Sequence, residues 1–295
     1  MYVIMGATGN IGSKLANILL DKGEKVEVIG RSAERLQPFV DHGAEAAVGA
    51  VSDMGFLTNV FKGADAVFAL IPPAYSANDF RGYYNEIGTN IAKSIQESGV
   101  RHVLFLSSLG AHLPEKTGPV KGLYDVEQEL NKLDDVNILH LRPTYFMENL
   151  LANIGMIKNM GINGDTIKGD MKFAMIATKD IAPVAADHLL KRDFSGKTVH
   201  ELLGERDISM DDVTKILGEK IGKPDLAYVQ FSVEDAKKGM MDFGLSDDVS
   251  DQMIELNQAI NDSLFAVNQP RTATNTTGTS IEEFADFFAQ IYESS

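Results

Sequence analysis

The sequence has 295 residues, a formal net charge of −15 and a pI of about 4.8. Because so acidic a chain repels nucleic acid and carries no cluster of lysine and arginine, we expect no nucleic-acid partner. The absence of cysteine excludes disulfides, a thiolate nucleophile and a cysteine metal site. No apolar run approaches the ~20 residues of a membrane helix and no charged segment precedes the apolar start, so we expect a cytoplasmic protein with no membrane partner.

The first twelve residues combine a strand, a glycine turn and a helix start. Residues 2–5 are apolar and β-forming, which is typical of a strand buried on both faces of a parallel sheet. Three glycines follow, and a helix beginning near residue 10 presents unpaired N–H groups and its positive dipole end to an anion. In strand–turn–helix context the glycines predict a pyrophosphate site, the alternative being a merely tight turn. The residues expected to contact the cofactor here are Gly6, Thr8, Gly9, Asn10, Ile11 and Gly12.

The second predicted strand, residues 25–29, runs into Arg31 and Ser32. At this position an acidic side chain accepts from the ribose 2′-hydroxyl of NAD, whereas an arginine pairs with the 2′-phosphate of NADP. We therefore favour NADP(H) over NAD(H), with both residues as cofactor contacts. The alternative is that Arg31 is a surface residue at a helix start.

Strands three and four are predicted at residues 46–51 and 65–71. Asp53 is expected to cap the next helix, the alternative being a place near the adenine. Ile71 and Pro72, where the fourth strand ends, are expected to lie along the path of the dinucleotide. The polar residues 74–81 form either a lid or an ordinary surface loop.

The alternation then continues with helices at residues 83–97 and 122–133 and strands at 101–107 and 136–142. Ser107 is expected to hydrogen-bond near the nicotinamide, and Pro143 is a further expected cofactor contact. This alternation of strands and helices predicts an α/β fold with a doubly wound parallel Rossmann sheet over residues 1–150.

Residues 151–295 are expected to form a smaller, mostly helical substrate-facing region, with returns to the sheet near 172–203. Residues 145–160 read as a helical stretch that is broken at 161–164. Ser280 and Glu283 match a capping box that starts a terminal helix. The other expected elements are strands at 172–177, 197–203 and 223–231, helices at 180–190, 209–221 and 233–264, and a loop at 272–279.

Several motifs together resemble the NmrA-like group of atypical short-chain dehydrogenase/reductases over nearly the whole chain. They are Gly6–Gly12, Gly30-Arg31, Ser107–Gly110, Leu141–Asn149, Asp180–Ala182 and Thr276–Phe284. The resemblance implies an NAD(P)-binding sheet domain with a small substrate-facing part. The group includes quinone, azo-type and isoflavone-type reductases, and also redox sensors that bind dinucleotide without turnover.

One departure from typical short-chain dehydrogenases concerns their Tyr-x-x-x-Lys pair, in which the phenol gives a proton to the alkoxide left by hydride transfer. Tyr124 is followed four residues later by Gln128. Anchoring on Glu127 to Leu130 instead places Leu123 at the lysine position. Neither register supplies the pair, so ordinary ketone–alcohol dehydrogenation is not expected.

The leading hypothesis is therefore NADPH-dependent reduction of a small flat electrophile such as a quinone, whose product stabilises its own charge. Tyr124 and Tyr145 are candidate polar contacts to substrate and Lys121 a candidate cationic partner, each with a packing or surface role as the alternative. The second hypothesis is a non-catalytic NADP(H) sensor that acts through a protein partner.

No metal site is expected, because the six histidines lack ligand spacing and His140 falls inside a buried strand. Met147, Met156 and Met160 form either a plastic wall for a flat substrate or ordinary core.

Overall fold

The computed structural model describes residues 1–265 and 270–295. In this part of the chain seven parallel strands form the central sheet, in the order β10-β6-β5-β4-β1-β2-β3. The strand order reverses between β1 and β4, which confirms the predicted doubly wound sheet. The strands are β1 (Tyr2–Ile4), β2 (Val26–Gly30), β3 (Glu45–Val48), β4 (Ala66–Ala69), β5 (His102–Leu106), β6 (Asn137–Pro143) and β10 (Lys197–Leu202).

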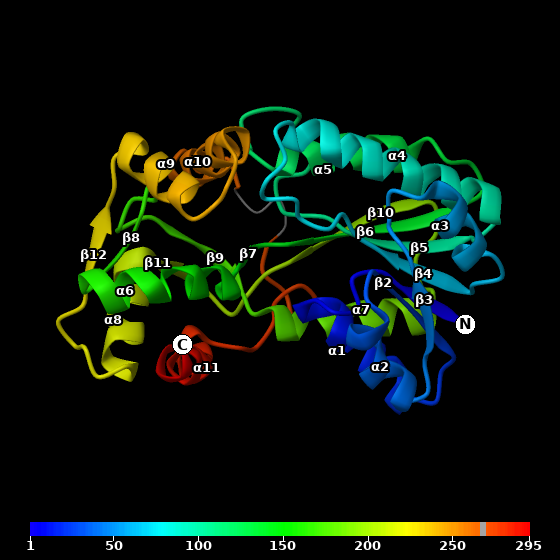
Figure 1. Ribbon diagram of the computed structural model, residues 1–295, viewed down its shortest axis with the longest axis horizontal. Coiled ribbons are helices and arrows are strands. Elements are labelled where there is room, and N and C mark those ends of the chain that lie inside the picture. The colour runs from blue at the N-terminus through cyan, green and yellow to red at the C-terminus, as the bar shows by residue number, and fades with distance from the viewer. Residues whose placement is uncertain (266–269) are drawn as a thin grey trace.

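Helices cover both faces of this sheet (Figure 1). One face carries α1 (Asn10–Asp21), α2 (Ala33–Asp41) and α7 (Thr178–Lys191). The other carries α3 (Met54–Phe61), α4 (Phe80–Ser98) and α5 (Val120–Asn131). Because both faces are covered, β1 and β4 are buried at every residue, as their unbroken apolar sequences predict.

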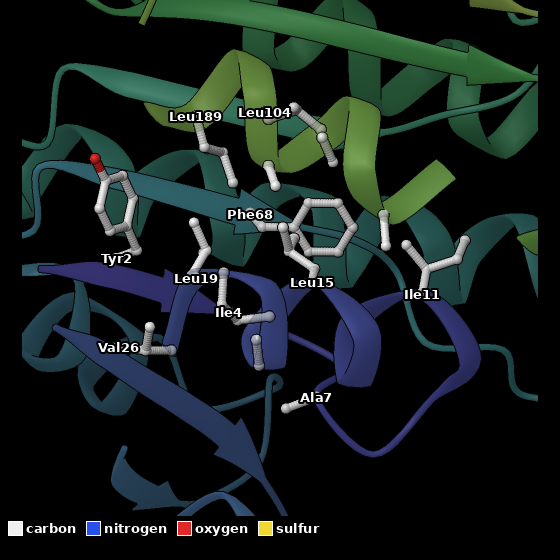
Figure 2. Close-up of a cluster of buried hydrophobic side chains, with 14 of the residues drawn as sticks. Tyr2, Ile4, Ala7, Ile11, Leu15, Leu19, Val26, Phe68, Leu104 and Leu189 are labelled. Carbon is white, nitrogen blue, oxygen red and sulfur yellow. The ribbon is translucent and has the colours of Figure 1, made fainter. Parts of the chain in front are cut away.

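The core on the α1 face is close-packed around Phe68 of β4 (Figure 2). Leu15 and Leu19 from α1 and Leu189 from α7 point toward it, and all four side chains are fully buried. Burying each such side chain contributes about 1.5–3 kcal/mol. This packing holds the start of α1, and with it the glycine turn, against the sheet.

The later part of the chain builds a second region around its own apolar core (Figure 1). Its strands are β7 (Tyr145–Phe146), β9 (Lys172–Ile176) and β11 (Asp207–Ser209) in one small sheet, and β8 (Ile162–Asp165) and β12 (Ala227–Gln230) in another. Its helices are the 3₁₀ helix η1 (Met147–Asn153), α6 (Ile154–Met160), α8 (Met210–Lys220), α9 (Val233–Asp242), α10 (Asp247–Asn261) and α11 (Ile281–Ser294).

This region contains more strand than the sequence predicts. Tyr145 and Phe146 were expected to be helical, but they pair with β9, whose residues lie some thirty positions further along the chain. The predicted break at 161–164 contains β8, which pairs with β12. The strand at 172–176 forms as predicted but joins β7 and β11, whereas β10 returns to the central sheet. Strand pairing between distant segments leaves no local signal.

The predicted helix starts agree better with the structure, because a capping side chain and the backbone N–H that it binds are close in the sequence. Asp53 caps α3 by accepting from the N–H of Phe56 at 2.9 Å, as predicted. Ser280 likewise accepts from the N–H of Glu283 at 3.2 Å. The expected loop at 74–81 is shorter than predicted, because Asp79 caps α4 and the helix already begins at Phe80.

Candidate dinucleotide and substrate site

The glycine turn leads into a helix start that is suited to binding an anion. Gly6 has a positive φ of 67°, and its carbonyl oxygen lies 2.3 Å from where a Cβ on Gly12 would sit, so that position excludes any side chain. Gly9 precedes α1 without any side-chain cap, and the first turn contains no acidic residue. The N–H groups at the start of α1 are therefore available to an anion together with the helix dipole.

A single cavity of about 770 Å³ begins at this turn and continues along the carboxyl ends of the central strands into the second region. This volume is within the range of sites that hold organic ligands. The predicted cofactor contacts on its wall are Gly6, Thr8, Gly9, Asn10, Ile11, Gly12, Arg31, Ile71, Pro72 and Ser107. Ser32 and Pro143 do not lie on the wall of this cavity; Ser32 instead caps α2, and Thr144 lines the cavity in place of its neighbour Pro143.

Two arginines bring positive charge to the half of the cavity formed by β1–β3. Arg35 donates to the carbonyl of Thr8 at 3.4 Å and so braces the glycine turn. Arg31 is exposed on the wall, and none of the described residues forms an ion pair with it. Arg31 is thus the arginine whose guanidinium is free for a ligand.

A buried polar group lies behind the other half of the cavity. The Ser107 hydroxyl, at the end of β5, donates to the carboxylate of Glu127 on α5. Arg142 of β6 donates to the same carboxylate through two nitrogens, with Nε 2.9 Å from Oε1. Glu127 is 1% exposed, so the ion pair is almost completely removed from water.

Tyr145 is the predicted substrate contact that the fold brings to the wall. Its ring meets Phe173 edge-on, with centroids 5.5 Å apart. Burial raises the pKa of Tyr145 well above its usual range, the charge of Asp165 raises it further, and a hydrogen bond with Asn149 opposes the shift. The phenol therefore remains protonated at neutral pH and keeps its proton for a hydrogen bond.

Lys121 and Tyr124, the other two candidates, do not lie on this wall. The Lys121 ammonium group pairs with Glu255 of α10. Helix α5 presents Val120 and Leu123 to the cavity instead. The helix that carries the Tyr-x-x-x-Lys pair in typical short-chain dehydrogenases is therefore apolar here where it faces the site.

The far end of the cavity has many apolar and aromatic side chains, and its polar lining residues are Asn149, Lys172, Thr178, Asp207 and Ser263. Its wall includes Phe146, Met171, Phe173, Leu256, Ile260 and Phe265. Of the methionines proposed as a wall, Met147 is buried in the core and Met160 is exposed, and none of the three lines this cavity. The contribution of α10 was missed because the sequence predicts its helix but not the surface on which it docks.

Further expectations concern metal binding, the core histidine and membrane-spanning helices. Within residues 1–265 and 270–295, no group of three or more histidine and acidic side chains is arranged to hold a metal ion. His140 lies in the core, as predicted, but only one ring nitrogen is satisfied: Nε2 lies 2.8 Å from Asn131 Oδ1, whereas Nδ1 has no hydrogen-bond partner among the described residues. Burial lowers the pKa of His140 to about 4. None of the described helices is long and apolar enough to cross a bilayer.

Comparison with known proteins shows which family and which relatives the chain resembles. The model of the NmrA-like family matches residues 2–285. The chain is 24% identical over 287 residues to the NAD(P)H azoreductase of Xenophilus azovorans, covering 97% of this chain and 96% of the relative.

Two solved structures share the fold. Triphenylmethane reductase of Citrobacter sp. superposes with a TM-score of 0.77 at 19% identity, over 98% of this chain and 99% of that one. An NADPH-dependent quinone oxidoreductase of Escherichia coli, complexed with NADPH, gives a TM-score of 0.75 at 21% identity, over 97% and 99%.

Proposed function

Since this chain belongs to the NmrA-like family, we propose that it is an NADPH-dependent oxidoreductase that reduces a small, flat electrophile such as a quinone. The observation that carries this proposal is the continuity of the cavity: one space joins the anion-binding turn and its arginines to a chamber with many apolar and aromatic side chains on its wall. Such a space can hold a dinucleotide and a planar substrate together.

The residues present fit a reduced dinucleotide. Uncapped N–H groups at the start of α1 can bind the pyrophosphate, and the unpaired Arg31 guanidinium can bind a 2′-phosphate. When bound, the nicotinamide supplies a hydride. The contribution of the protein is to orient the two reactants and to exclude water from between them.

The end of the cavity that we assign to the substrate suits a hydride acceptor that depends little on a proton from an acidic side chain. Phe173 and Ile260 offer flat apolar contact, and Tyr145 offers one hydrogen-bond donor to a substrate oxygen. Because α5 presents Val120 and Leu123 to the cavity, while Lys121 and Tyr124 do not lie on its wall, we do not propose alcohol–ketone chemistry. The quinol anion left by hydride transfer stabilises its own charge and can take the one proton that it needs from water.

A single-turnover experiment tests the proposal. One equivalent of NADPH is bound, a panel of quinones, azo compounds and enones is added, and the absorbance of the reduced nicotinamide is followed. We expect rapid loss of absorbance with a quinone. Tight binding with stable absorbance across the panel would contradict the proposal and favour the non-catalytic NADP(H) sensor acting through a protein partner.

Two tyrosine variants serve as a matched pair. Tyr145→Phe removes the hydroxyl on the wall and is expected to slow quinone reduction about tenfold, the value of one hydrogen bond. Tyr124→Phe removes a hydroxyl from α5 away from the wall and is expected to leave the rate unchanged.

A further inference from the structure

The buried ion pair between Glu127 and Arg142 has no role in the proposed chemistry so far. It joins α5 to β6 directly beneath Ser107, at the half of the cavity formed by β4–β6. In a doubly wound sheet this second half holds the nicotinamide nucleotide when the first half holds the adenosine. A buried ion pair is weak evidence for stability, since apolar residues of similar volume often serve as well, so its position invites a functional explanation.

The hydrogen bond between Ser107 and Glu127 has a defined direction. A carboxylate paired with arginine has no proton to give, so in the contact between Ser107 and Glu127 the serine must be the donor. The hydroxyl has one proton, and this contact uses it. The Ser107 oxygen can therefore only accept a hydrogen bond from a molecule in the cavity.

The neighbouring strand end carries a complementary group. Thr144 follows β6 and lies on the cavity wall, and its hydroxyl has no hydrogen-bond partner among the described residues. Backbone bonds hold the two strand ends side by side, from Ser107 N to Leu141 O at 2.8 Å and from Leu109 N to Pro143 O at 2.9 Å. The Thr144 hydroxyl is almost inaccessible as it stands, so contact requires rotation of its side chain. An unpaired buried hydroxyl is unfavourable, and such a contact would satisfy it.

We propose that Ser107 and Thr144 together recognise a primary carboxamide, with Ser107 accepting from its NH₂ and Thr144 donating to its carbonyl oxygen. Glu127 and Arg142 are positioning residues that hold Ser107 as an acceptor. The group recognised is the carboxamide of the nicotinamide ring, so the inference rests on the proposed dinucleotide function. It adds that this chain recognises the carboxamide of the nicotinamide ring as well as the phosphates of the dinucleotide.

The test compares the affinities of NADP⁺ and its 3-acetylpyridine analogue, in which a methyl group replaces the amide NH₂ and the carbonyl remains. Dissociation constants are measured by titration calorimetry, so no turnover is needed. We expect the wild type to bind NADP⁺ about fivefold to tenfold more tightly, the range of one hydrogen bond.

Substitutions at the two hydroxyls should then give different patterns. Ser107→Ala should bring the affinity ratio close to one, because only NADP⁺ loses a bond. Thr144→Val should weaken both ligands by a similar factor and keep the ratio, because both have the carbonyl. Ser108→Ala is the control: it removes a neighbouring hydroxyl on the same wall that already bonds the Leu109 carbonyl, and it should leave the ratio unchanged.

The ion pair is tested by removing both charges together, as Glu127→Leu/Arg142→Met, because a single substitution leaves a buried charge unpaired and can unfold the protein. With the Ser107 hydroxyl free to turn, the ratio should fall to about two. A wild-type ratio near one, or a ratio that survives Ser107→Ala, would overturn the inference while tight NADP⁺ binding left the proposed function intact. Failure of the wild type to bind either dinucleotide would overturn both.

Discussion

The two arginines at the end of the cavity nearest the glycine turn differ in their contacts. Arg35 is engaged with the Thr8 carbonyl, and the carboxyl end of β2 places Arg31 on the wall without an acidic partner. An acidic side chain at this point would accept from the ribose hydroxyl of NAD, and none of the cavity-lining residues in this half supplies one. These contacts support our proposal of NADPH as the preferred cofactor.

Reversing the charge of Arg31 should therefore change cofactor choice. We expect Arg31→Glu to weaken NADPH binding about 30-fold or more and NADH binding less than threefold, because only NADPH carries the 2′-phosphate that the new carboxylate would repel. Binding is measured by fluorescence titration of each dinucleotide. Arg101→Glu makes the same charge change at an exposed position before β5 and should alter neither affinity. Equal losses for both dinucleotides would show that Arg31 does not contact the 2′-phosphate.

Among the elements, the β1–α1 turn has a backbone geometry that is tightly constrained by its glycines. The Gly9 N–H bonds the Gly6 carbonyl at 2.9 Å, and Gly12 packs directly against that same carbonyl. A side chain at Gly12 would displace the helix from the strand and rotate its free N–H groups. Helix position and anion binding are thus coupled in this element.

Gly12→Ala is expected to lower the free energy of unfolding by about 1–3 kcal/mol through overpacking and to reduce NADPH affinity at least tenfold. Thermal unfolding and a binding titration measure the two effects. Gly155→Ala on α6 is the matched control, since a Cβ there meets open space. It should stabilise the protein slightly, by up to about 1 kcal/mol, because alanine is the better helix former. Unchanged binding in Gly12→Ala would refute the coupling.

Helix α10 connects the central sheet to the second region (Figure 1). On the sheet side its Asp248 accepts from the N–H of Phe80 at 2.8 Å, and its Glu255 pairs with Lys121. On the other side its Asn257 donates to Asp165 at 2.6 Å. The helix also contributes Leu256 and Ile260 to the cavity wall, so the same contacts that join the regions enclose the site.

Asp165 makes this junction sensitive to pH. Burial raises its pKa to about 6, against 3.8 for the ordinary side chain, and hydrogen bonds from Thr166 and Asn257 only partly oppose the shift. Between about pH 4 and pH 6 the folded protein holds a proton that the unfolded chain releases. The contribution of Asp165 to stability is therefore greatest below pH 4 and is lost as the pH rises through 6.

Asp165→Asn should remove this dependence, because an amide oxygen can still accept from Asn257 and Thr166 while carrying no charge. We expect the variant to be more stable than the wild type by about 1–3 kcal/mol at pH 8 and nearly equal to it at pH 4. Urea unfolding at both pH values measures the difference. Asp170→Asn, at an exposed position nearby, should show no such trend. A variant that is less stable than the wild type at pH 8 would contradict this assignment.

Features that a few consecutive residues encode could be predicted from the sequence. The apolar run before Gly6, the glycine spacing and the caps at Asp53 and Ser280 each specify a local backbone conformation, and their alternation specifies a doubly wound sheet. The family resemblance followed from the same local motifs and is confirmed by the match over residues 2–285.

The surroundings of the cavity could not be predicted in this way, because they depend on how distant elements pack. The tertiary structure turned Tyr145 toward the wall by pairing β7 with β9, engaged Lys121 with Glu255, and brought Arg142 to Glu127 beneath Ser107. The partners in these contacts are far apart along the chain, up to 134 positions for Lys121 and Glu255. Such contacts depend on how whole elements pack, and the local preferences of their residues contain no information about the partner.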